Sequence, residues 1–303
     1  MKNRTVTTTI DQNKCIGCEL CVQVCPSQTI SMQGDKAAVT GDQSLNCGHC
    51  AAACPVDAIR VNGIDGDSLK FNTFILENKW LPFGAFDPAE LVRLMASRRS
   101  CRNFDDRTVD RGTLADLVKI GTTAPSGSNC QDWTFTVLPT RAAVMQFGDA
   151  ILEFFKRINR LAEKRLLCRL HKILGKPQLD NYYREHYPSV RDGITDWEQH
   201  GRDRLFHGAT AVILVGAKPG GSCPREDALL AAQNILLAAH AMKLGTCLIG
   251  YAVEALRNGP IIKKALGIPP EESVYAVIAL GYPAEAYRKL PGRKKFVSRF
   301  VAS

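Results

Sequence analysis

The sequence contains no long uninterrupted apolar run. Its longest apolar stretch, residues 228–242, is interrupted by Gln233, Asn234 and His240, so it is too short and too polar to span a bilayer and predicts a buried helix. The first fifteen residues, MKNRTVTTTIDQNKC, lack the apolar segment that a secretory signal requires. We therefore expect a cytoplasmic protein with no membrane partner.

Common nucleotide-binding motifs are also absent. The chain contains no G-x-G-x-x-G and no G-x-x-x-x-G-K-[ST], so neither a Rossmann site nor a P-loop is indicated. Its formal charge is +9, from 39 Lys and Arg against 30 Asp and Glu. No aromatic residues are interleaved with these basic residues as a nucleic-acid platform requires, and we expect no nucleic-acid partner. The excess charge suits the phosphate of a bound cofactor and an acidic protein electron donor.

Cysteine, in contrast, is abundant and unevenly distributed. Seven of the twelve cysteines fall between Cys15 and Cys54. In a chain without a secretion signal, such a cluster indicates metal or redox chemistry rather than disulfides. This asymmetry predicts a first domain boundary after the cysteine-rich segment. The pattern of that segment predicts a short duplicated unit of strands, cysteine-rich turns and short helices.

The spacing of these cysteines is typical of a bacterial two-cluster ferredoxin. The first run is complete: Cys15, Cys18, Cys21 and Cys25, with Pro26 after it. The second run lacks its first cysteine and has Ser44 in that place, followed by Cys47, Cys50 and Cys54. A zinc ribbon of Cys15, Cys18, Cys47 and Cys50 would leave the remaining cysteines of both runs without a role.

The first three positions of each run are expected to bind one cluster, while the cysteine at the fourth position reaches the other cluster. The first cluster, a [4Fe–4S], is thus assigned to Cys15, Cys18, Cys21 and Cys54. The second is assigned to Cys25, Cys47, Cys50 and, in the fourth place, Ser44. Serine is a poorer iron ligand than thiolate because of its high pKa. The second cluster is therefore a Ser-ligated or water-ligated [4Fe–4S], which we favour, a [3Fe–4S], or a cluster with a remote ligand such as Cys101.

The rest of the chain alternates helices with a few strands, which indicates an α+β or α/β domain. Asp87-Pro88-Ala89-Glu90 predicts a helix start, because it combines an N-cap aspartate, an early proline and an acid at the third position. The apolar patterns predict further helices over 114–121, 151–174 and 228–244, and strands over 133–138, 209–216 and 274–280.

Four ordered elements resemble motifs of the nitroreductase family of FMN enzymes, specifically of members with an N-terminal ferredoxin domain. An R-R-S-x-R-x-F element lies at 98–104 and an A-P-S-x-x-N-x-Q-x-W element at 124–133. A G-L-G-T-x-x-I-G element is approximated at 243–250, and a G-Y-P…R-K element spans 281–294. The arginines of the first element, taken alone, suit a phosphate monoester but could equally form a basic surface patch.

This resemblance implies an α+β fold with a central sheet flanked by helices. It implies a two-cluster ferredoxin domain over 1–65, a connector over 66–86 and an FMN-binding domain over 87–303. The FMN phosphate and ribityl chain would be held by Arg98, Arg99, Ser100, Arg102 and Arg293. Pro125, Ser126 and Asn129 would contact FMN across the interface of a homodimer. Gln131 would lie near the isoalloxazine edge, and the backbone of Ile249-Gly250 would face the flavin.

We expect a low-potential donor, a ferredoxin, flavodoxin or NAD(P)H, to reduce the clusters, which pass electrons through FMN to a small acceptor. This acceptor would be a nitroaromatic, a quinone, an activated alkene or a halogenated aromatic. Two alternatives stay open: an electron-transfer or redox-sensing protein that acts on a protein partner, and an enzyme whose FMN takes electrons directly from NAD(P)H, with the clusters carrying the electrons outward. Residues 151–207 are expected to determine substrate choice. If these residues enclose a pocket above the flavin, a small acceptor is favoured. If they leave the flavin edge flat and exposed, a protein partner is favoured.

Overall fold

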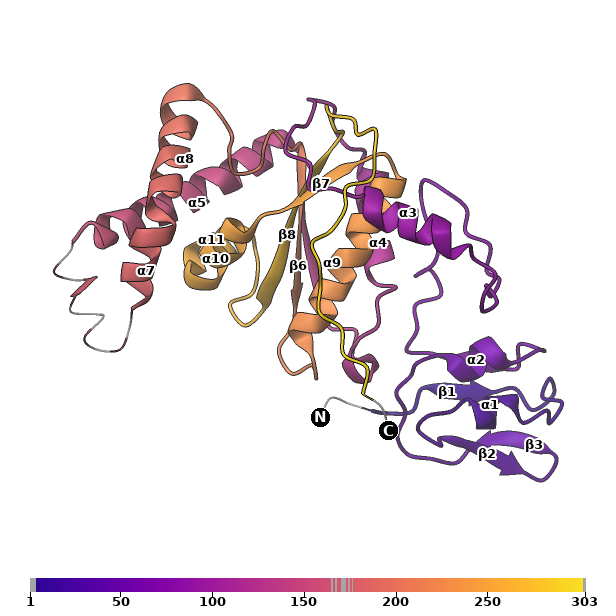
Figure 1. Cartoon of the computed structure of the whole chain (residues 1–303). Helices are drawn as coiled ribbons and strands as arrows, with labels where there is room; N and C mark the ends of the chain where they lie inside the picture. The colour runs from indigo at the N-terminus through magenta and orange to yellow at the C-terminus, as the bar shows by residue number, and fades with distance from the viewer. Residues whose placement is uncertain are drawn as a thin grey trace.

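The computed structural model describes residues 4–164, 166, 168–169, 173, 175 and 177–301. Figure 1 shows a small cysteine-rich domain and a larger domain in which helices cover a central sheet, and this confirms the predicted α+β class. Within the described residues, no helix combines the length and the hydropathy needed to cross a membrane.

The small domain is a duplicated unit. Its strands form two antiparallel pairs, β1 (Thr8–Ile10) with β4 (Ile59–Val61) and β2 (Ile30–Gln33) with β3 (Lys36–Val39). Helices α1 (Leu20–Gln23) and α2 (His49–Ala53) pack beside them. Residues 29 positions apart share a left-handed backbone: Gly17 and Asn46, Glu19 and Gly48, Gln28 and Asp57. The duplication seen in the cysteine spacing therefore extends to the backbone conformation.

The larger domain is built on a four-stranded antiparallel sheet in the order β5-β6-β8-β7. These strands are β5 (Trp133–Leu138), β6 (Ala211–Ala217), β8 (Ser273–Gly281) and β7 (Gly245–Leu248). Trp133 and Ser273 both pair with Ala217 at one end of the sheet, and Gly245 pairs with Gly281 at the other. We call these the lower and upper ends, as Figure 1 draws them. The strand predicted over 133–138 has the bounds of β5.

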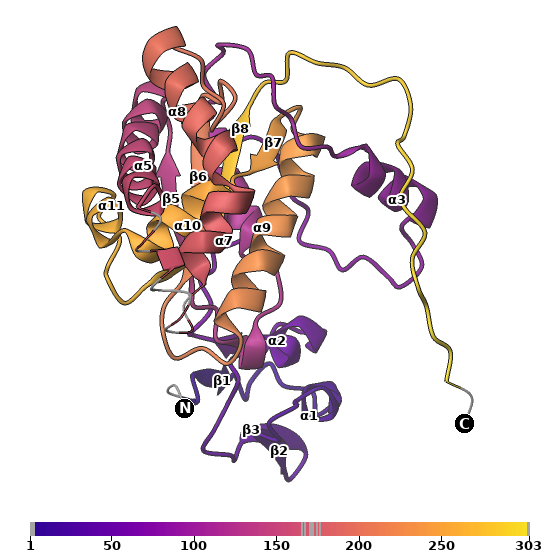
Figure 2. The ribbon, with the colours of Figure 1, turned by 60° about the vertical axis from the view of Figure 1, so that its left-hand side comes forward.

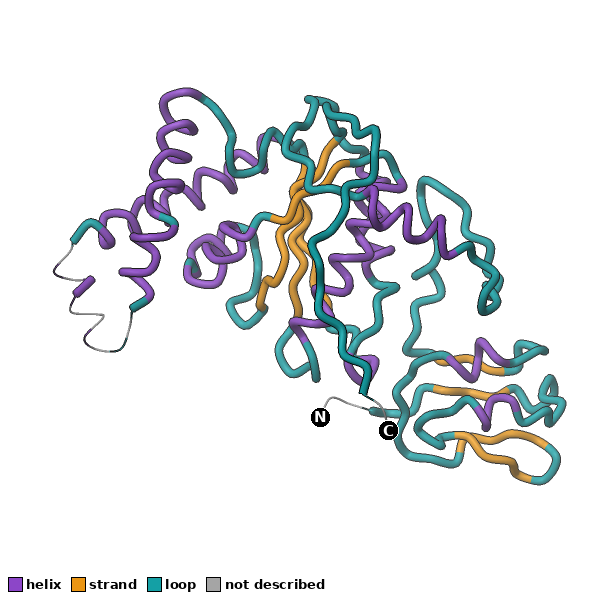
Figure 3. The backbone as a smooth tube through the Cα atoms, viewed as in Figure 1, coloured by secondary structure: helices purple, strands orange, loops and turns teal. Residues whose placement is uncertain are grey.

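Helices cover both faces of this sheet. Helices α4 (Arg111–Gly121) and α9 (Pro224–Ala241) pack on one face, and α5 (Arg141–Ala162), α10 (Gly250–Asn258) and α11 (Pro260–Ala265) on the other. Alternate residues of the fully buried strand β6 supply both cores: Ile213 faces α9, while Val212 and Leu214 face α5. Figure 3 shows the sheet enclosed between these two helical layers.

Helix α5 differs from the helix predicted over 151–174. It begins ten residues earlier, at Arg141, where the Thr140 side chain accepts a hydrogen bond from the Ala143 N–H (3.2 Å), and it ends at Ala162. The apolar pattern concealed this first half because Gly148 interrupts it. A Cβ on that glycine would lie 2.3 Å from the Trp197 ring. The contact with Trp197, which is distant in the sequence, therefore requires a glycine at this position. Leu170 and Leu174, two apolar residues near the end of the predicted helix, lie outside the described residues.

Two further helices cap α5 on the side away from the sheet. They are α7 (Gln178–Glu185) and α8 (Tyr187–His200), and both contact α5. Figure 1 shows this cap at the opposite side of the molecule from the cysteine-rich domain. The cap lies within the segment expected to determine substrate choice.

The connector between the two domains is fixed by Asp116 of α4, whose carboxylate is fully buried. The carboxylate accepts hydrogen bonds from the backbone and side chains of Asn72 and Thr73, at 2.7–3.0 Å. Nearby, the Lys119 ammonium donates to the carbonyls of Asp67 (3.1 Å) and Lys70 (2.7 Å). These contacts hold the connector to the larger domain of its own chain.

Candidate functional site

The seven clustered cysteines line two separate cavities in the small domain. Cavity I is lined by Cys15, Cys18, Cys21 and Cys54. Cavity II is lined by Cys25, Cys47 and Cys50, together with Ser44. Each cavity thus combines one run of residues with a single cysteine from the other half of the duplication, as the two-cluster assignment requires. The four ligands of a zinc ribbon would instead be divided between both cavities.

Backbone N–H groups point at the two cysteines that cross between the halves. Thr29 N–H donates to Cys25 Sγ (3.3 Å), and Ala58 N–H donates to Cys54 Sγ (3.2 Å). Burial opposes ionisation of the Cys25 thiol, but the hydrogen bonds from Thr29 and its neighbours outweigh it and lower the pKa of Cys25. Among the described residues, no three His, Cys, Asp or Glu side chains converge closely enough for a single metal ion. Two cysteine-lined cavities, each drawing on both halves of the duplication, suit two iron–sulfur clusters.

Ser44 occupies the corner of cavity II that corresponds to Cys15 in cavity I, 29 positions earlier. Its Oγ accepts a hydrogen bond from the Asn46 N–H (3.0 Å). The remote candidate Cys101 is buried at the upper end of the sheet beside Gly245 and lines neither cavity. The structure thus brings Ser44, and not Cys101, to cavity II.

A second group of predicted site residues meets at the upper end of the sheet. Ser100 forms a parallel bridge with Thr246, and Cys101 N–H donates to the Thr246 carbonyl (2.9 Å), so residues 98–102 run beside β7. Burial and the nearby Arg99 and Arg293 lower the pKa of Arg98. The Nε of Arg98 is buried and has no hydrogen-bond partner among the described residues. Three neighbouring guanidinium groups, those of Arg98, Arg99 and Arg293, suit an anion such as a phosphate monoester.

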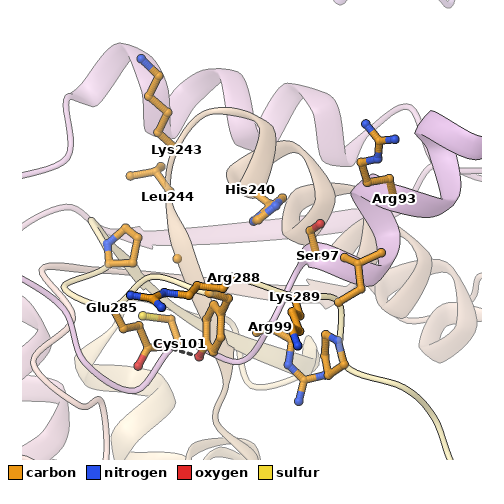
Figure 4. A pocket seen from close by; sticks show the side chains of 15 residues that line it. Arg93, Ser97, Arg99, Cys101, His240, Lys243, Leu244, Glu285, Arg288 and Lys289 are labelled. Atoms are coloured by element: carbon orange, nitrogen blue, oxygen red, sulfur yellow. Dashed lines mark hydrogen bonds between the residues drawn. The ribbon is translucent and has the colours of Figure 1, made fainter.

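Arg99 also lines an adjoining basic cavity of about 580 Å³. Figure 4 shows the side chains that surround it, which come from α3 (Pro88–Ser97), the end of α9 and the segment after β8. Its charged side chains are Arg93, Arg99, Lys243, Glu285, Arg288 and Lys289. The positive potential of the arginine group therefore extends over this end of the molecule.

The junction of β7 and α10 borders a cavity of about 760 Å³. Ile249 N–H donates to the Val277 carbonyl (2.9 Å) and is therefore not available to a ligand. Gly250 opens α10, and the first N–H groups of a helix have no partner within it, so the Gly250 N–H is a candidate donor to a ligand. Arg102 lines the same cavity. Aromatic and histidine side chains, mostly from the cap and from α5, complete the lining: Phe155, Tyr182, His186, His207 and Tyr251.

The remaining predicted flavin contacts lie in a loop before β5, at the lower end of the sheet. This loop contains Pro125, Ser126, Asn129 and Gln131. Ser126 Oγ accepts from the Gln131 N–H (3.1 Å), and Gln131 Nε2 donates to Asn129 Oδ1 (2.9 Å). Within one chain, the structure does not bring these residues to the arginine group.

Asp227 organises this loop, and the sequence did not reveal its role. Its carboxylate accepts from the Gly127 N–H (2.9 Å) and the Cys130 thiol (3.3 Å), and its carbonyl accepts from the Trp133 indole N–H (3.1 Å). The residue is buried in the first turn of α9. Acids are ordinary at that position, so the sequence carried no signal of a contact some hundred residues away.

Two family models match this chain. The model of the Nitroreductase family matches residues 95–282. The chain belongs to the nitroreductase family. A second family model, the 4Fe-4S dicluster domain, matches residues 8–61.

Relatives of this nitroreductase-family chain cover its two parts separately. It is 28% identical to a 4-nitrobenzoate reductase of a Nocardioides species over 62% of this chain and 78% of that protein. It is 28% identical to an iodotyrosine dehalogenase 1 homolog of Caenorhabditis elegans over 63% of this chain and 54% of that protein. NADH-quinone oxidoreductase subunit I of Pelobacter propionicus is 31% identical over 22% of this chain and 41% of its own length.

Among solved structures, a nitroreductase with bound FMN from Bacteroides fragilis superposes with a TM-score of 0.51 at 21% identity. The match covers 70% of this chain and 99% of that one, which shows the shared fold. The two family matches confirm the predicted architecture of a ferredoxin-like domain followed by a nitroreductase domain. The dicluster match contains all seven clustered cysteines and Ser44.

Proposed function

We propose that the protein is an iron–sulfur flavoprotein oxidoreductase that passes electrons from two clusters to FMN and on to a small acceptor. One observation carries the proposal: a dicluster domain with two cysteine-lined cavities is joined to a nitroreductase domain in which Arg98, Arg99 and Arg293 lie close together. A phosphate would balance the charge of these guanidinium groups. The FMN-bound relative in Bacteroides fragilis supports FMN as its source.

The residues of this chain would bind and orient the cofactor. Arg98, Arg99, Arg102, Arg293 and the Ser100 hydroxyl would hold the phosphate and ribityl chain. The Gly250 N–H would donate to the ring system beside the 760 Å³ cavity. When bound, a flavin can accept electrons singly and deliver them in pairs, which explains why iron–sulfur clusters are useful partners for it.

The acceptor we propose is a small aromatic molecule with a nitro, quinone or halogen group. The cavity beside Gly250 supports this choice, because Tyr182 and Tyr251 line it and the Tyr251 ring meets Phe155 edge-on with centroids 5.6 Å apart. Arg102 and Arg204 line the same cavity and could bind an acidic substituent. The named substrates of two relatives, 4-nitrobenzoate and iodotyrosine, are aromatic carboxylates of this size.

The same cavity favours an enzyme over a protein that only transfers electrons to another protein. Helix α7 lines one side of this cavity, so the junction of β7 and α10 lies beside a hollow and not on a flat edge. A small molecule fits the cavity, and this supports an enzyme that acts on a small acceptor.

We further propose that the protein is a homodimer. The C-terminal tail exposes large apolar side chains, with Phe296, Val297, Phe300 and Val301 at least 79% exposed. Helix α3 buries no residue, and Figure 2 shows that α3 and the tail project from the rest of the molecule. Exposed apolar segments of this extent mark an interaction site, and a second copy of the chain is the commonest occupant.

Anaerobic spectroscopy of the FMN-loaded and cluster-loaded protein tests the proposed function. A reduced ferredoxin, NADH and NADPH are each added as donor, and 4-nitrobenzoate is then added as acceptor. We expect a donor to bleach both the cluster and flavin absorbance, and the acceptor to restore both. The proposal fails if the protein retains no FMN, or if 4-nitrobenzoate and a quinone both leave the reduced chromophores unchanged.

A further inference from the structure

The two predicted halves of the flavin site lie at diagonally opposite corners of the sheet. The arginine group lies beside β7, at one edge and at the upper end. The 125–131 loop precedes β5, at the other edge and at the lower end. At about 3.3 Å per residue, the length of β8 is about 26 Å, and three strand spacings add a width of about 14 Å.

The flavin-facing junction is also far from this loop within one chain. Ile249 pairs with Val277, midway along β8, but still on the β7 edge. Half the sheet length and its full width separate it from Trp133, which amounts to about 20 Å. Transfer of single electrons slows steeply with distance, so a flavin bound by a chain's own arginines is poorly placed for a donor beside that chain's loop.

The 44–47 segment, which lines cavity II, contacts the 125–131 loop at the lower end of the sheet. Asn129 Nδ2 donates to the carbonyls of Leu45 (2.9 Å) and Asn46 (3.3 Å), which lie between the cavity II residues Ser44 and Cys47. Asn129 also has a left-handed backbone at φ 53°, as do Ser128 and Gln131. Several unfavourable backbone conformations in one loop persist only where the surrounding structure holds them, and such strain is typical of functional sites.

The small domain is not free to reach the upper end of its own chain. The Asn129 contact holds one side of it, and the buried Asp116 holds the connector that follows it. The docked corner also carries exposed apolar side chains of its own, because Asp227, which binds the loop, is followed on α9 by the exposed Leu229 and Leu230.

We propose that cavity II of each protomer serves the flavin site of the partner protomer. The 125–131 loop would form one wall of that site and hold the 44–47 segment behind it. A two-fold dimer makes the arrangement reciprocal, so that both flavin sites are completed in the same way. This inference rests on the proposed function, because it requires both the dimer and the bound cofactors.

The electron count is simple for this route. A low-potential one-electron donor reduces the clusters, and two electrons cross the interface one at a time. With two protons from water they complete the reduction of one flavin, and a two-electron acceptor takes the pair.

Mixed dimers, purified through two different affinity tags, test the route by the FMN fluorescence lifetime, which a nearby iron–sulfur cluster shortens. In the first mixed dimer, one chain carries Arg98→Ala and Arg102→Ala, and the other carries Cys47→Ala. In the second, one chain carries all three changes and its partner is wild type. Each dimer then holds one FMN, and no donor or acceptor is needed.

We expect the first mixed dimer to show the short lifetime of the wild type, and the second to show the long lifetime of the Cys47→Ala homodimer. The reverse pattern would mean that each cluster serves its own chain's flavin and would overturn the inference. Equal lifetimes in the wild-type and Cys47→Ala homodimers would also overturn it, since no cluster would then be near a flavin.

If Cys47→Ala does not fold, Cys25→Ala replaces it. Cys25 also lines cavity II but lies outside the 44–47 segment that contacts Asn129. The proposed function is judged separately, by the reoxidation of the wild-type protein with 4-nitrobenzoate. A reversed lifetime pattern with intact reoxidation would reject only the route between subunits.

Discussion

At the scale of single residues, Arg98 is the most constrained of the predicted cofactor contacts. The motif identified it together with its neighbours, but the sequence could not show that its Nε is buried without a partner. The surroundings of Arg98 include Arg293, which lowers its pKa, and the segment 98–102 pairs with β7; both are distant in the sequence. Arg98, Ser100 and Arg102 all lie near Cys247, and the Arg102 side chain also lines the cavities under the cap.

Replacement of Arg98 by Ala should weaken FMN binding. A hydrogen bond to a charged group contributes about 1.5–3 kcal/mol, and this loss corresponds to a roughly ten- to one-hundred-fold higher Kd. Titration of the apoprotein with FMN, followed by fluorescence, measures the change. Arg111→Ala, on the exposed start of α4, is the matched control and should bind FMN as the wild type does. Equal affinities in the two variants would reject the phosphate site.

Ser44 allows a second prediction at this scale. Ser44→Cys should still assemble both clusters and should lose iron more slowly under mild oxidation, because thiolate is a better iron ligand than the serine hydroxyl. Iron and sulfide counts with EPR before and after oxidant follow the loss. Ser31→Cys, whose native hydroxyl contacts Thr40 outside cavity II, is the control. If wild type and Ser44→Cys lose iron equally fast, Ser44 does not occupy the fourth position.

At the scale of elements, the sequence predicted those helix starts that neighbouring residues determine, and it missed one that depends on a distant contact. The start of α3 was correct because Asp87 caps it directly, accepting from the Ala89 N–H (2.8 Å). The start of α5 was wrong because a contact with Trp197 selects Gly148. The motif at 124–133 identified the loop residues, but their separation from the arginine group follows from strand order, which the sequence did not supply.

The connector yields a prediction with a pH dependence. Burial opposes ionisation of Asp116, but the hydrogen bonds from Asn72 and Thr73 outweigh it and lower its pKa below the ordinary 3.8. Its stabilising effect should therefore be complete above about pH 4 and should fade as the pH falls through the lowered pKa. Asp116→Ala should release the connector at neutral pH, with a loss of at least about 1.5 kcal/mol, the contribution of one charge-assisted hydrogen bond.

Limited trypsin digestion detects this release as faster cleavage at Lys70 and Lys79. Asp106→Ala, at an exposed site, is the control. Unchanged cleavage in a folded Asp116→Ala protein, verified by circular dichroism, would show that the connector is held by other contacts.

At the scale of the whole molecule, the sequence predicted the order of the two domains and their chemistry. It did not predict which corner of the larger domain the small one occupies. That position depends on the contacts of Asn129, Asp116 and Lys119, each made with a segment more than forty residues away. None of these contacts has a local signature.

The exposed tail predicts the assembly state. Light scattering of the FMN-replete protein should give twice the 33.2 kDa of one chain. The double change Phe296→Asp and Phe300→Asp should shift the mass towards one chain, because it places charge where apolar side chains are expected to be covered. Ser298→Asp, in the same tail, is the control. A wild-type mass of one chain would refute the dimer.

The anchoring of the connector on Asp116 also affects the kinetic order of electron delivery. A separate ferredoxin would have to find the flavin domain by diffusion, and its rate would depend on the concentration of both proteins. A domain held in place by its own chain instead presents a fixed effective concentration, so that only the external donor needs to be encountered. Dilution of the enzyme should then leave its internal transfer rate unchanged for as long as the chains remain assembled.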